Sequence, residues 1–351
     1  MVPSGVLDHE ELLTRRGERS GMRLAIAVHS TVLGPALGGC RMWHYERPED
    51  GIEDAMRLAH AMTMKAAAAG LALGGGKGVI CLDRAHPAPQ LRRAALLDFA
   101  DAVESLEGRY ITAEDVGTGT EDMSVIAERT GHVVGLPASL GGAGDPSPVT
   151  ARGVERAIRA CCSQRLGSRD LEGVRVCVVG LGHVGAALAR RLAAGGAELL
   201  VTDIDPGRLA LARQLGARWV DPDAALVSDC DVLAPCALGE VVDEANVDRL
   251  RCRILCGSAN NVLAHESLAG RLQERGIVYA PDFIANAGGL IHVFAELHGY
   301  DPARVDELVD SIGDTVEQVL SDAELAGTTP LEAAHDLARR RLAAASSVRA
   351  A

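Results

Sequence analysis

The spacing of apolar residues predicts strands and helices in alternation along the whole chain. Residues 22–29 and 109–116 are short apolar runs of the kind that form strands. Between them, residues 49–70 and 90–106 carry apolar side chains at helical spacing, and Gly70 is a suitable end for the first helix. For the first third of the chain we therefore expect strand, strand, helix, glycine loop, strand, helix, strand.

The rest of the chain continues this alternation. Residues 150–167 predict a helix, and residues 174–205 change from a strand pattern to a helix pattern and back to a strand. Three more short apolar runs and two amphipathic segments follow, at 231–237, 253–257, 276–281, 303–320 and 329–345. Strands that alternate with helices predict an α/β fold with a parallel sheet covered by helices.

A segment rich in Gly, Pro and Ser, residues 136–150, marks the expected junction between two domains. A chain of 351 residues is long enough for two cores. We expect an N-terminal α/β domain over residues 1–140, to which C-terminal helices at about 305–351 return. Residues 145–304 then form a doubly wound, Rossmann-type dinucleotide-binding domain.

Composition and charge exclude several classes of partner. The net charge of −13, with no basic patch, argues against binding to nucleic acid. The first twenty residues resemble neither a signal peptide nor a membrane anchor, so we expect a cytoplasmic protein with no membrane partner. Nine cysteines are scattered without a CxxC pair, which predicts buried free thiols and no metal site.

A glycine motif predicts where a dinucleotide binds. Gly180, Gly182 and Gly185 form G-x-G-x-x-G between a predicted strand and a predicted helix. The first glycine permits a tight turn, the second lets the backbone approach a pyrophosphate, and the third lets the helix pack on the strand. His183 and Val184 open the helix, whose N-terminus offers free N–H groups to phosphate. The alternative is a glycine-rich turn that binds no ligand.

An acidic residue at the end of the next strand indicates which dinucleotide is bound. Asp203 follows Gly180 by 23 residues, close to the usual separation of about 20. Its carboxylate is expected to accept hydrogen bonds from the adenosine ribose and to repel a 2′-phosphate. With Asp205 close by, we expect NAD rather than NADP, and Arg208 is the nearby cation that argues the other way.

One lysine, Lys77, stands in a run of glycines over residues 70–83. A triphosphate-binding loop is excluded, because Leu71 replaces its first glycine and Gly78 replaces its hydroxyl residue. Lys65 ends the preceding helix and Asp115 follows a predicted strand, so these three side chains could converge on one cleft. The alternative is that they are solvated surface side chains, although apolar and glycine neighbours are poor surroundings for a solvated lysine.

Six segments resemble the leucine/phenylalanine/valine dehydrogenase branch of the amino-acid dehydrogenases. They are residues 34–43, 61–80, 110–123, 144–153, 257–262 and 280–293, and the similarity extends in order from about residue 20 to about residue 340. Enzymes of this family oxidatively deaminate an L-amino acid to a 2-oxo acid and ammonia and pass a hydride to a nicotinamide. The family also implies a homo-oligomer built through the first domain, with an even number of subunits, and a cleft that closes on the substrate.

The resemblance implies a role for each candidate residue of the first domain. Lys65 pairs with the substrate α-carboxylate, helped by backbone N–H groups around Gly38 and Gly39. Lys77 acts as general base on the water that attacks the imine carbon, and Asp115 exchanges protons with the amino group. Burial and a neighbouring cation, which we expect to be Lys65, would lower the pKa of Lys77 enough for this role.

Three polar residues of the second domain carry open alternatives. Asn260 and Asn261 follow a predicted strand, where the resemblance implies contacts to the nicotinamide ribose or the substrate. An Asn-rich turn that caps a helix is the alternative. Thr150 contacts the nicotinamide amide or, alternatively, N-caps the next helix.

The residues expected around the substrate side chain are apolar. Members specific for glutamate carry a lysine at the position of Leu37, so the resemblance disfavours glutamate here. The other positions matched to the pocket are Ala113, Leu290 and Val293. An aliphatic or aromatic L-amino acid follows, although the same residues also suit an unusual oxo acid of a biosynthetic pathway. A non-catalytic NAD-binding protein is the rival from another class.

Overall fold

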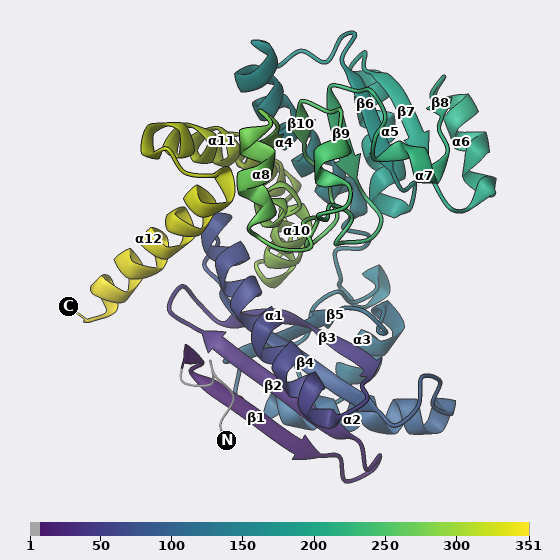
Figure 1. Cartoon of the computed structure of the whole chain (residues 1–351). Coiled ribbons are helices and arrows are strands. Elements are labelled where there is room, and N and C mark those ends of the chain that lie inside the picture. The colour runs from purple at the N-terminus through teal and green to yellow at the C-terminus, as the bar shows by residue number, and fades with distance from the viewer. Residues whose placement is uncertain (1–7, 351) are drawn as a thin grey trace. The chain divides into compact units, whose positions relative to one another are not determined.

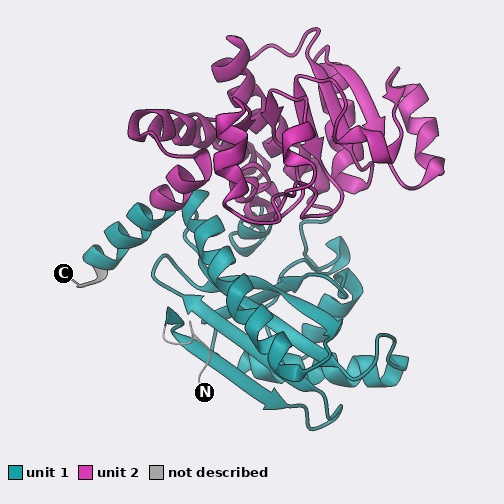
Figure 2. Ribbon diagram, in the orientation of Figure 1, with its two compact units in different colours: residues 1–144, 293–300, 338–351 teal, residues 145–292, 301–337 magenta. Residues whose placement is uncertain are grey.

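The structure, a computed structural model, describes residues 8–350 and divides into two compact units (Figures 1 and 2). The first unit contains the described residues up to Gly144, together with residues 293–300 and 338–350. The second unit contains residues 145–292 and 301–337. The chain passes from the first unit to the second within the segment rich in Gly, Pro and Ser at 136–150.

The first unit is built on a five-stranded mixed sheet in the order β1-β2-β4-β3-β5. Strands β3, β4 and β5 are parallel to one another, and β2 is antiparallel to both of its neighbours. The elements are β1 (Glu11–Arg16), β2 (Arg23–Ser30), β3 (Ala36–His44), α1 (Pro48–Ala68), β4 (Gly74–Leu82), α2 (Pro89–Glu104), β5 (Tyr110–Glu114) and α3 (Thr120–Ile126). Three strands therefore precede α1, where the sequence predicted two.

The predicted glycine loop around Lys77 is wrong, because these residues belong to the buried strand β4. The glycines make room for neighbours on both faces of the sheet. A Cβ at Gly75 would lie 2.1 Å from the backbone nitrogen of Thr63 in α1, whereas one at Gly78 would lie 2.3 Å from Phe99 Cζ in α2. Helices α1 and α2 thus cover opposite faces of the sheet, and α1 packs directly on the β4 backbone.

We expect Gly78→Ala to destabilise the first unit by about 1–3 kcal/mol, because the new methyl group overlaps the buried Phe99 ring. Gly131→Ala is the matched control, since a Cβ there meets nothing within 4 Å. Its effect should stay within about 0.5 kcal/mol. Thermal unfolding of both variants measures the difference, and equal midpoints would contradict this account of the glycines.

The second unit contains an all-parallel six-stranded sheet in the order β11-β10-β9-β6-β7-β8, as the sequence predicted. The chain runs outward from β6 in one direction through β7 and β8, then returns to β9 on the other side and continues to β10 and β11. The strands are β6 (Arg175–Val179), β7 (Glu198–Thr202), β8 (Arg218–Trp219), β9 (Val232–Pro235), β10 (Ile254–Leu255) and β11 (Val278–Tyr279). The strand order therefore reverses between β6 and β9, which is where open α/β sheets bind ligands.

The helices that follow residue 146 include those predicted over residues 150–167, 303–320 and 329–345. They are α4 (Ser147–Leu166), α5 (His183–Ala194), α6 (Leu209–Gln214), α7 (Pro222–Ala225), α8 (Leu268–Glu274), α9 (Asp282–Ala285), α10 (Gly288–Leu297), α11 (Pro302–Ala326) and α12 (Pro330–Ala350). Helices α10 and α12 each begin in the second unit and end in the first.

Helix α11 groups with the second unit, whereas we expected residues 305–351 to return to the first. Asp310 of α11 accepts hydrogen bonds from Arg152 (3.0 and 2.9 Å) and Arg156 (2.8 Å) of α4. Gly153 makes this packing close, since a Cβ there would lie 2.6 Å from Ile312. Residues 338–350 do group with the first unit, where Arg341 donates to the carbonyl of Ala68 at the end of α1.

The cysteines are free thiols, as expected, and all but the half-buried Cys236 are buried. Within residues 8–350, no group of three or more His, Cys, Asp or Glu side chains is placed to hold a metal ion. The helices found in the same residues include none that is both long and apolar enough to cross a membrane.

Candidate active site

All but one of the candidate residues of β3, β4 and β5 lie on the face of the sheet that α1 covers. Leu37 of β3 pairs with Gly75 of β4, and Gly75 faces α1. Side chains alternate between the two faces along each strand, and paired residues of neighbouring strands share a face. Gly39 pairs with Ala113 of β5 in this register. The α1 face therefore carries Leu37, Gly39, Arg41, Lys77 and Ala113, while Gly38 belongs to the opposite face of the same inner strand.

Lys77 and Asp115 form an ion pair. Lys77 Nζ lies 2.7 Å from Asp115 Oδ1, and the two side chains are 5% and 22% exposed. Asp115 comes directly after β5, where Thr118 fixes its backbone: the Asp115 N–H donates to Thr118 Oγ1, and that hydroxyl donates to the Cys40 carbonyl. Gly39 leaves the space that Asp115 fills, since a Cβ there would lie 2.7 Å from Asp115 Cβ.

The surroundings lower the pKa values of both Lys77 and Asp115. Burial lowers the pKa of Lys77, Asp115 opposes that shift, and Arg41 adds to it. Burial alone would raise the pKa of Asp115, but Lys77 and Arg41 outweigh it and the pKa is lowered. Asp115 is therefore held ionised, while the neutral amine of Lys77 becomes accessible at lower pH than that of a solvated lysine.

Arg41 is a residue of this site that the sequence reasoning missed. Its Nε donates to Asp115 Oδ2 at 2.9 Å, and its Nη1 donates to Asp54 Oδ2 of α1 at 2.8 Å. It lowers the pKa of Lys77, which is the effect that we expected of Lys65. Lys65 itself is half-buried in the last turn of α1. A charged residue at an inward position of an otherwise apolar strand was the available signal.

The glycine turn of the second unit leaves space in front of helix α5. Gly180 has φ of +101°, and a Cβ at Gly185 would lie 2.0 Å from the Gly180 carbonyl oxygen, so both glycines are needed for the turn and its packing. Gly182 has an ordinary φ of −64°, and a Cβ there would meet nothing within 4 Å. The open space beside Gly182 therefore adjoins the N-terminus of α5, where His183 and Val184 begin the helix. Helix N-termini in general offer unpaired backbone N–H groups to phosphate.

Asp203 supports this turn through one carboxylate oxygen and fixes the chain that follows β7 through the other. Its Oδ2 accepts from the Leu181 N–H at 2.6 Å, and its Oδ1 accepts from the Asp205 N–H at 2.8 Å. Arg208 Nε lies 3.6 Å from Asp205 Oδ2, so its charge is partly neutralised. Asp203 thus holds the glycine turn against the end of β7, at the place where a ribose contact was predicted.

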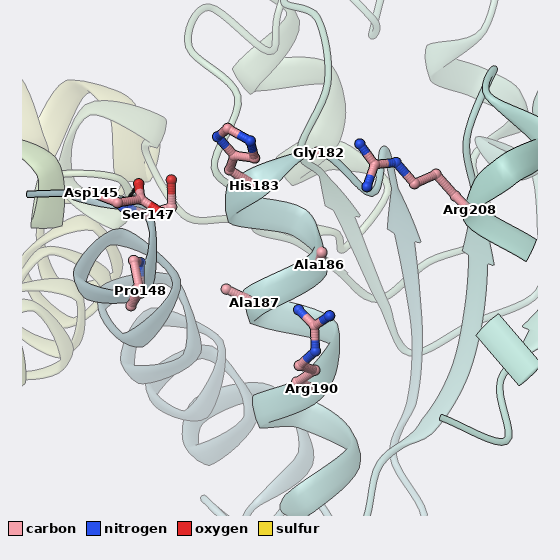
Figure 3. A pocket seen from close by; sticks show the side chains of 9 residues that line it. All are labelled: Asp145, Ser147, Pro148, Gly182, His183, Ala186, Ala187, Arg190 and Arg208. Carbon is pink, nitrogen blue, oxygen red and sulfur yellow. Dashed lines mark hydrogen bonds between the residues drawn. The ribbon is translucent and has the colours of Figure 1, made fainter. Parts of the chain in front are cut away.

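A pocket of about 320 Å³ opens beside helix α5 (Figure 3). Its walls are the start of α4 on one side and the first turns of α5 on the other, with Arg190 and Arg208 as its cations. Asp145 Oδ1 accepts from the Ser147 N–H at 2.9 Å, which fixes the start of α4. The pocket therefore combines two arginines with the carboxylate of Asp145.

Asn260 is held in place by a buried neighbour, Asn286. Asn286 Nδ2 donates to Asn260 Oδ1 at 2.8 Å and to the Ser258 carbonyl at 3.2 Å. This arrangement uses the Asn260 oxygen as an acceptor and leaves its amide nitrogen as the group that can donate to a ligand. Asn261 adopts a left-handed φ of +50°. The helix-capping alternative for these residues is wrong, because α8 begins at Leu268 after Ser267.

Thr150 and the two remaining pocket residues lie on α4 and α10. Thr150 is in the first turn of α4 and donates to the Pro146 carbonyl at 3.0 Å. Pro146 is the N-cap of that helix, so the N-cap alternative for Thr150 is wrong. Leu290 is buried in the part of α10 that belongs to the second unit, and Val293 is half-buried in the part that belongs to the first.

Comparison with known proteins identifies the family. Residues 9–132 match the profile of the dimerisation domain of Glu/Leu/Phe/Val dehydrogenases, and residues 201–350 match that of Glutamate/Leucine/Phenylalanine/Valine dehydrogenase. A leucine dehydrogenase of Bacillus subtilis (strain 168) is 45% identical over 336 residues, which cover 95% of this chain and 92% of that protein. The chain belongs to the Glu/Leu/Phe/Val dehydrogenase family. The family, the two-domain α/β fold and the amino-acid dehydrogenase class predicted from the sequence are thereby confirmed.

Two further relatives act on aromatic amino acids, by their names. A phenylalanine dehydrogenase of Caldalkalibacillus thermarum (strain TA2.A1) is 39% identical over 96% of this chain and 92% of its own. The crystal structure of L-tryptophan dehydrogenase from Nostoc punctiforme matches with a TM-score of 0.87 and 36% identity, over 97% of this chain and 98% of that chain. Residues 151–245 also match the NAD-binding domain of D-isomer specific 2-hydroxyacid dehydrogenases, a likeness confined to the second unit.

This amino-acid dehydrogenase contains two lysines in its 351 residues, and they are Lys65 and Lys77. The other 33 of its 35 Lys and Arg residues are arginines. An arginine stays protonated in proteins and presents a planar fork, whereas a lysine presents a compact ammonium that can lose its proton when buried. Both lysines of this chain are thus candidate residues of the site predicted from the sequence.

Proposed function

We propose that the chain catalyses the NAD-dependent, reversible oxidative deamination of an apolar L-amino acid of the leucine, valine or phenylalanine type. The products are the 2-oxo acid and ammonia. The observation that carries this proposal is the pair of buried Lys77 and half-buried Asp115, 2.7 Å apart, on a face of the sheet with apolar Leu37 and Ala113. A lysine with a lowered pKa beside an ionised aspartate supplies the base and the proton carrier that the reaction needs.

Each candidate residue of the first unit is proposed to have one task in this reaction. Lys65 binds the substrate α-carboxylate, with help from the backbone of Gly38 and Gly39. The neutral amine of Lys77 takes a proton from the water that attacks the imine carbon. Asp115 exchanges protons with the substrate nitrogen as ammonia leaves. When bound, NAD would supply the acceptor for the hydride that leaves the substrate Cα.

The residues of the second unit fit NAD. The turn of Gly180, Gly182 and Gly185 and the N-terminus of α5 with His183 and Val184 would hold the diphosphate. Asp203 would hold the adenosine ribose. Asn260 and Thr150 would contact the nicotinamide end, Asn260 through the amide nitrogen that Asn286 leaves available.

The substrate side chain is proposed to contact Leu37, Ala113, Leu290 and Val293, with Asn260 and Asn261 beside the substrate. Leu37 offers no charge to a γ-carboxylate, which disfavours glutamate. Relatives named for leucine, phenylalanine and tryptophan all share about two fifths of this sequence, so they support an apolar substrate without choosing its shape. We also propose a homo-oligomer with an even number of subunits, supported by the match of residues 9–132 to a dimerisation domain.

The test is the initial rate of NADH formation with each proteinogenic L-amino acid at alkaline pH. We expect turnover of leucine, valine or phenylalanine that disappears in the Lys77→Ala control. If no amino acid is turned over although NAD binds, the proposal for these substrates fails. An unusual oxo acid or a non-catalytic NAD-binding protein would then be the better account.

Replacing Asp203 by serine should weaken NAD binding by about tenfold or more, because the ribose loses a charged acceptor and the Leu181 N–H loses its partner. Asp205→Ser is the matched control, since that carboxylate accepts from the Gly207 N–H and does not support the glycine turn. The KM for NAD, measured for both variants together with the KM for NADP, tests this prediction. An unchanged KM for NAD in the Asp203 variant would contradict the proposed ribose site.

A further inference from the structure

Arg41 contacts both Asp115, the ion-pair partner of the proposed base Lys77, and Asp54 of helix α1. Its guanidinium donates from Nε to Asp115 Oδ2 at 2.9 Å and from Nη1 to Asp54 Oδ2 at 2.8 Å. Asp115 therefore shares its two oxygens between two cations, with Oδ1 on Lys77 and Oδ2 on Arg41. The side chains of Arg41 and Asp115 are 21% and 22% exposed, so solvent screens these contacts less than it would at the surface.

Asp54 is fixed in turn by two further donors. The Tyr45 hydroxyl donates to Asp54 Oδ2 at 2.8 Å, and Arg57 Nη2 donates to Asp54 Oδ1 at 2.7 Å. Asp54 lies on α1, the helix that packs on the β4 backbone and carries Lys65 in its last turn. The guanidinium of Arg41 is thus held at both ends, and its position relative to Asp115 is set by α1 as well as by β3.

The position of Arg41 matters because Arg41 and Asp115 have opposing effects on the pKa of Lys77. A carboxylate with a single cationic neighbour stabilises the charged form of that neighbour. With Lys77 as its sole partner, Asp115 would favour the ammonium form and disfavour the base. A second cation on the other oxygen takes up part of the carboxylate charge and also repels a proton on Lys77.

We propose that Arg41 is a positioning residue that holds Asp115 between two cations and thereby keeps Lys77 available as a base. This inference rests on the proposed function, in which Lys77 and Asp115 act on the substrate. Arg41 stays charged throughout, because an arginine does not lose its proton in proteins. Asp54, Tyr45 and Arg57 serve the same purpose indirectly by fixing the guanidinium.

The titratable and charged groups that act on the pKa of Lys77 are Asp115, which follows β5, and Arg41 and Cys40 of β3. Helix α1, which covers this face of the sheet, carries Asp54, paired with Arg41, and Lys65 in its last turn. Burial raises the pKa of the Cys40 thiol well above its usual value, so this group stays neutral over the working range. Asp115 and Arg41 are therefore the charges on the sheet that act on Lys77, and they act in opposite directions.

The direct test uses the fact that the chain contains two lysines. Protein labelled with an isotope at lysine Cε gives two side-chain NMR resonances, and Lys65→Arg assigns them. In the full-length Arg41→Gln variant, we expect the Lys77 resonance to titrate at higher pH than in the unaltered protein. The acid limb of the kcat/KM profile should move the same way, so that kcat/KM below that limb falls about tenfold or more.

Three further variants sharpen this test. Asp54→Asn loosens the guanidinium from its far end and should shift the titration in the same direction by a smaller amount. Arg41→Lys keeps a cation and should restore part of the pH profile. Arg93→Gln is the matched control, since Arg93 pairs with Glu128 at the surface and should leave both titrations unchanged.

The outcomes separate this inference from the proposed function. If Arg41→Gln lowers activity equally at every pH and the Lys77 titration does not move, Arg41 is merely structural and the inference is overturned. If Lys77→Ala keeps its activity, the proposed function fails, whatever Arg41 does. The lysine titration requires no turnover, so it tests the Arg41 effect even in that case, and thermal unfolding of each variant checks that it is folded.

Discussion

Replacing Lys77 by alanine should lower kcat by about 10²–10⁴-fold, the range that a positioned general base contributes. The reason is that the water attacking the imine carbon loses the group that takes its proton. NAD binding should change little, because the dinucleotide is proposed to bind in the second unit. Steady-state rates with the best amino acid, together with NAD binding by titration calorimetry, measure both effects.

An arginine at each of the two lysine positions separates a base from a cation. Lys77→Arg keeps a positive charge that can pair with Asp115, but its guanidinium does not deprotonate in proteins. This variant should therefore be nearly as inactive as Lys77→Ala. Lys65→Arg keeps the cation that the α-carboxylate needs, so it should raise KM while retaining far more of kcat. Substantial activity in Lys77→Arg would show that Lys77 acts through its charge and would contradict the general-base role.

The alternation of strands and helices could be predicted from the sequence because each element carries its own pattern. Strands buried on both faces appear as short apolar runs, and helices with one buried face show apolar residues at helical spacing. Both patterns are local, so β6, α5 and β7 were predicted together with the glycine turn. Of the three strands before α1, residues were predicted for β2 alone. Strand β1, with the sequence ELLTRR, shows no clear alternation because its side chains are half-buried or exposed.

The strand nature of residues 74–78 could not be predicted because glycine has low strand propensity. These glycines are in a strand because Thr63, Phe99 and Tyr110 occupy the space that side chains would need. None of those neighbours is close to β4 in the sequence. Long-range packing therefore outweighs the local preference, and the effect becomes visible in the folded chain.

The position of α11 illustrates the same limit for helices. Its apolar face predicts that it packs on something, but many grooves accept such a face. Asp310 identifies the partner by binding Arg152 and Arg156 of α4, more than 150 residues away in the sequence. The candidate site is likewise assembled by register, since β3, β4 and β5 bring residues 41, 77 and 115 together. Lys77 and Asp115 were candidates from their places in the sequence, and the family resemblance supplied their roles, whereas Arg41 emerged from its contacts.

Replacing Asp115 by asparagine should also lower kcat by about 10²–10⁴-fold, because the substrate nitrogen loses the carboxylate with which it exchanges protons. The same variant should move the titration of Lys77 to lower pH. Asp115 raises the pKa of Lys77 against the effect of burial, so the neutral side chain of asparagine removes a charge that favours the ammonium form. Asp101→Asn is the matched control, since Asp101 pairs with Arg19 and Arg129 and should leave Lys77 unaffected.

The direction of that shift is what gives the experiment its strength. Loss of Arg41 should move the acid limb of the pH profile to higher pH, and loss of the Asp115 charge should move it to lower pH. Both variants remove the ion pair between Arg41 and Asp115, so general damage to the site would shift the two profiles in one direction or not at all. Opposite shifts, seen both in the rates and in the Lys77 resonance, require that the neutral amine of Lys77 is the active form. A shift to higher pH in Asp115→Asn would contradict the electrostatic account of both residues, because a lost anion cannot stabilise an ammonium group.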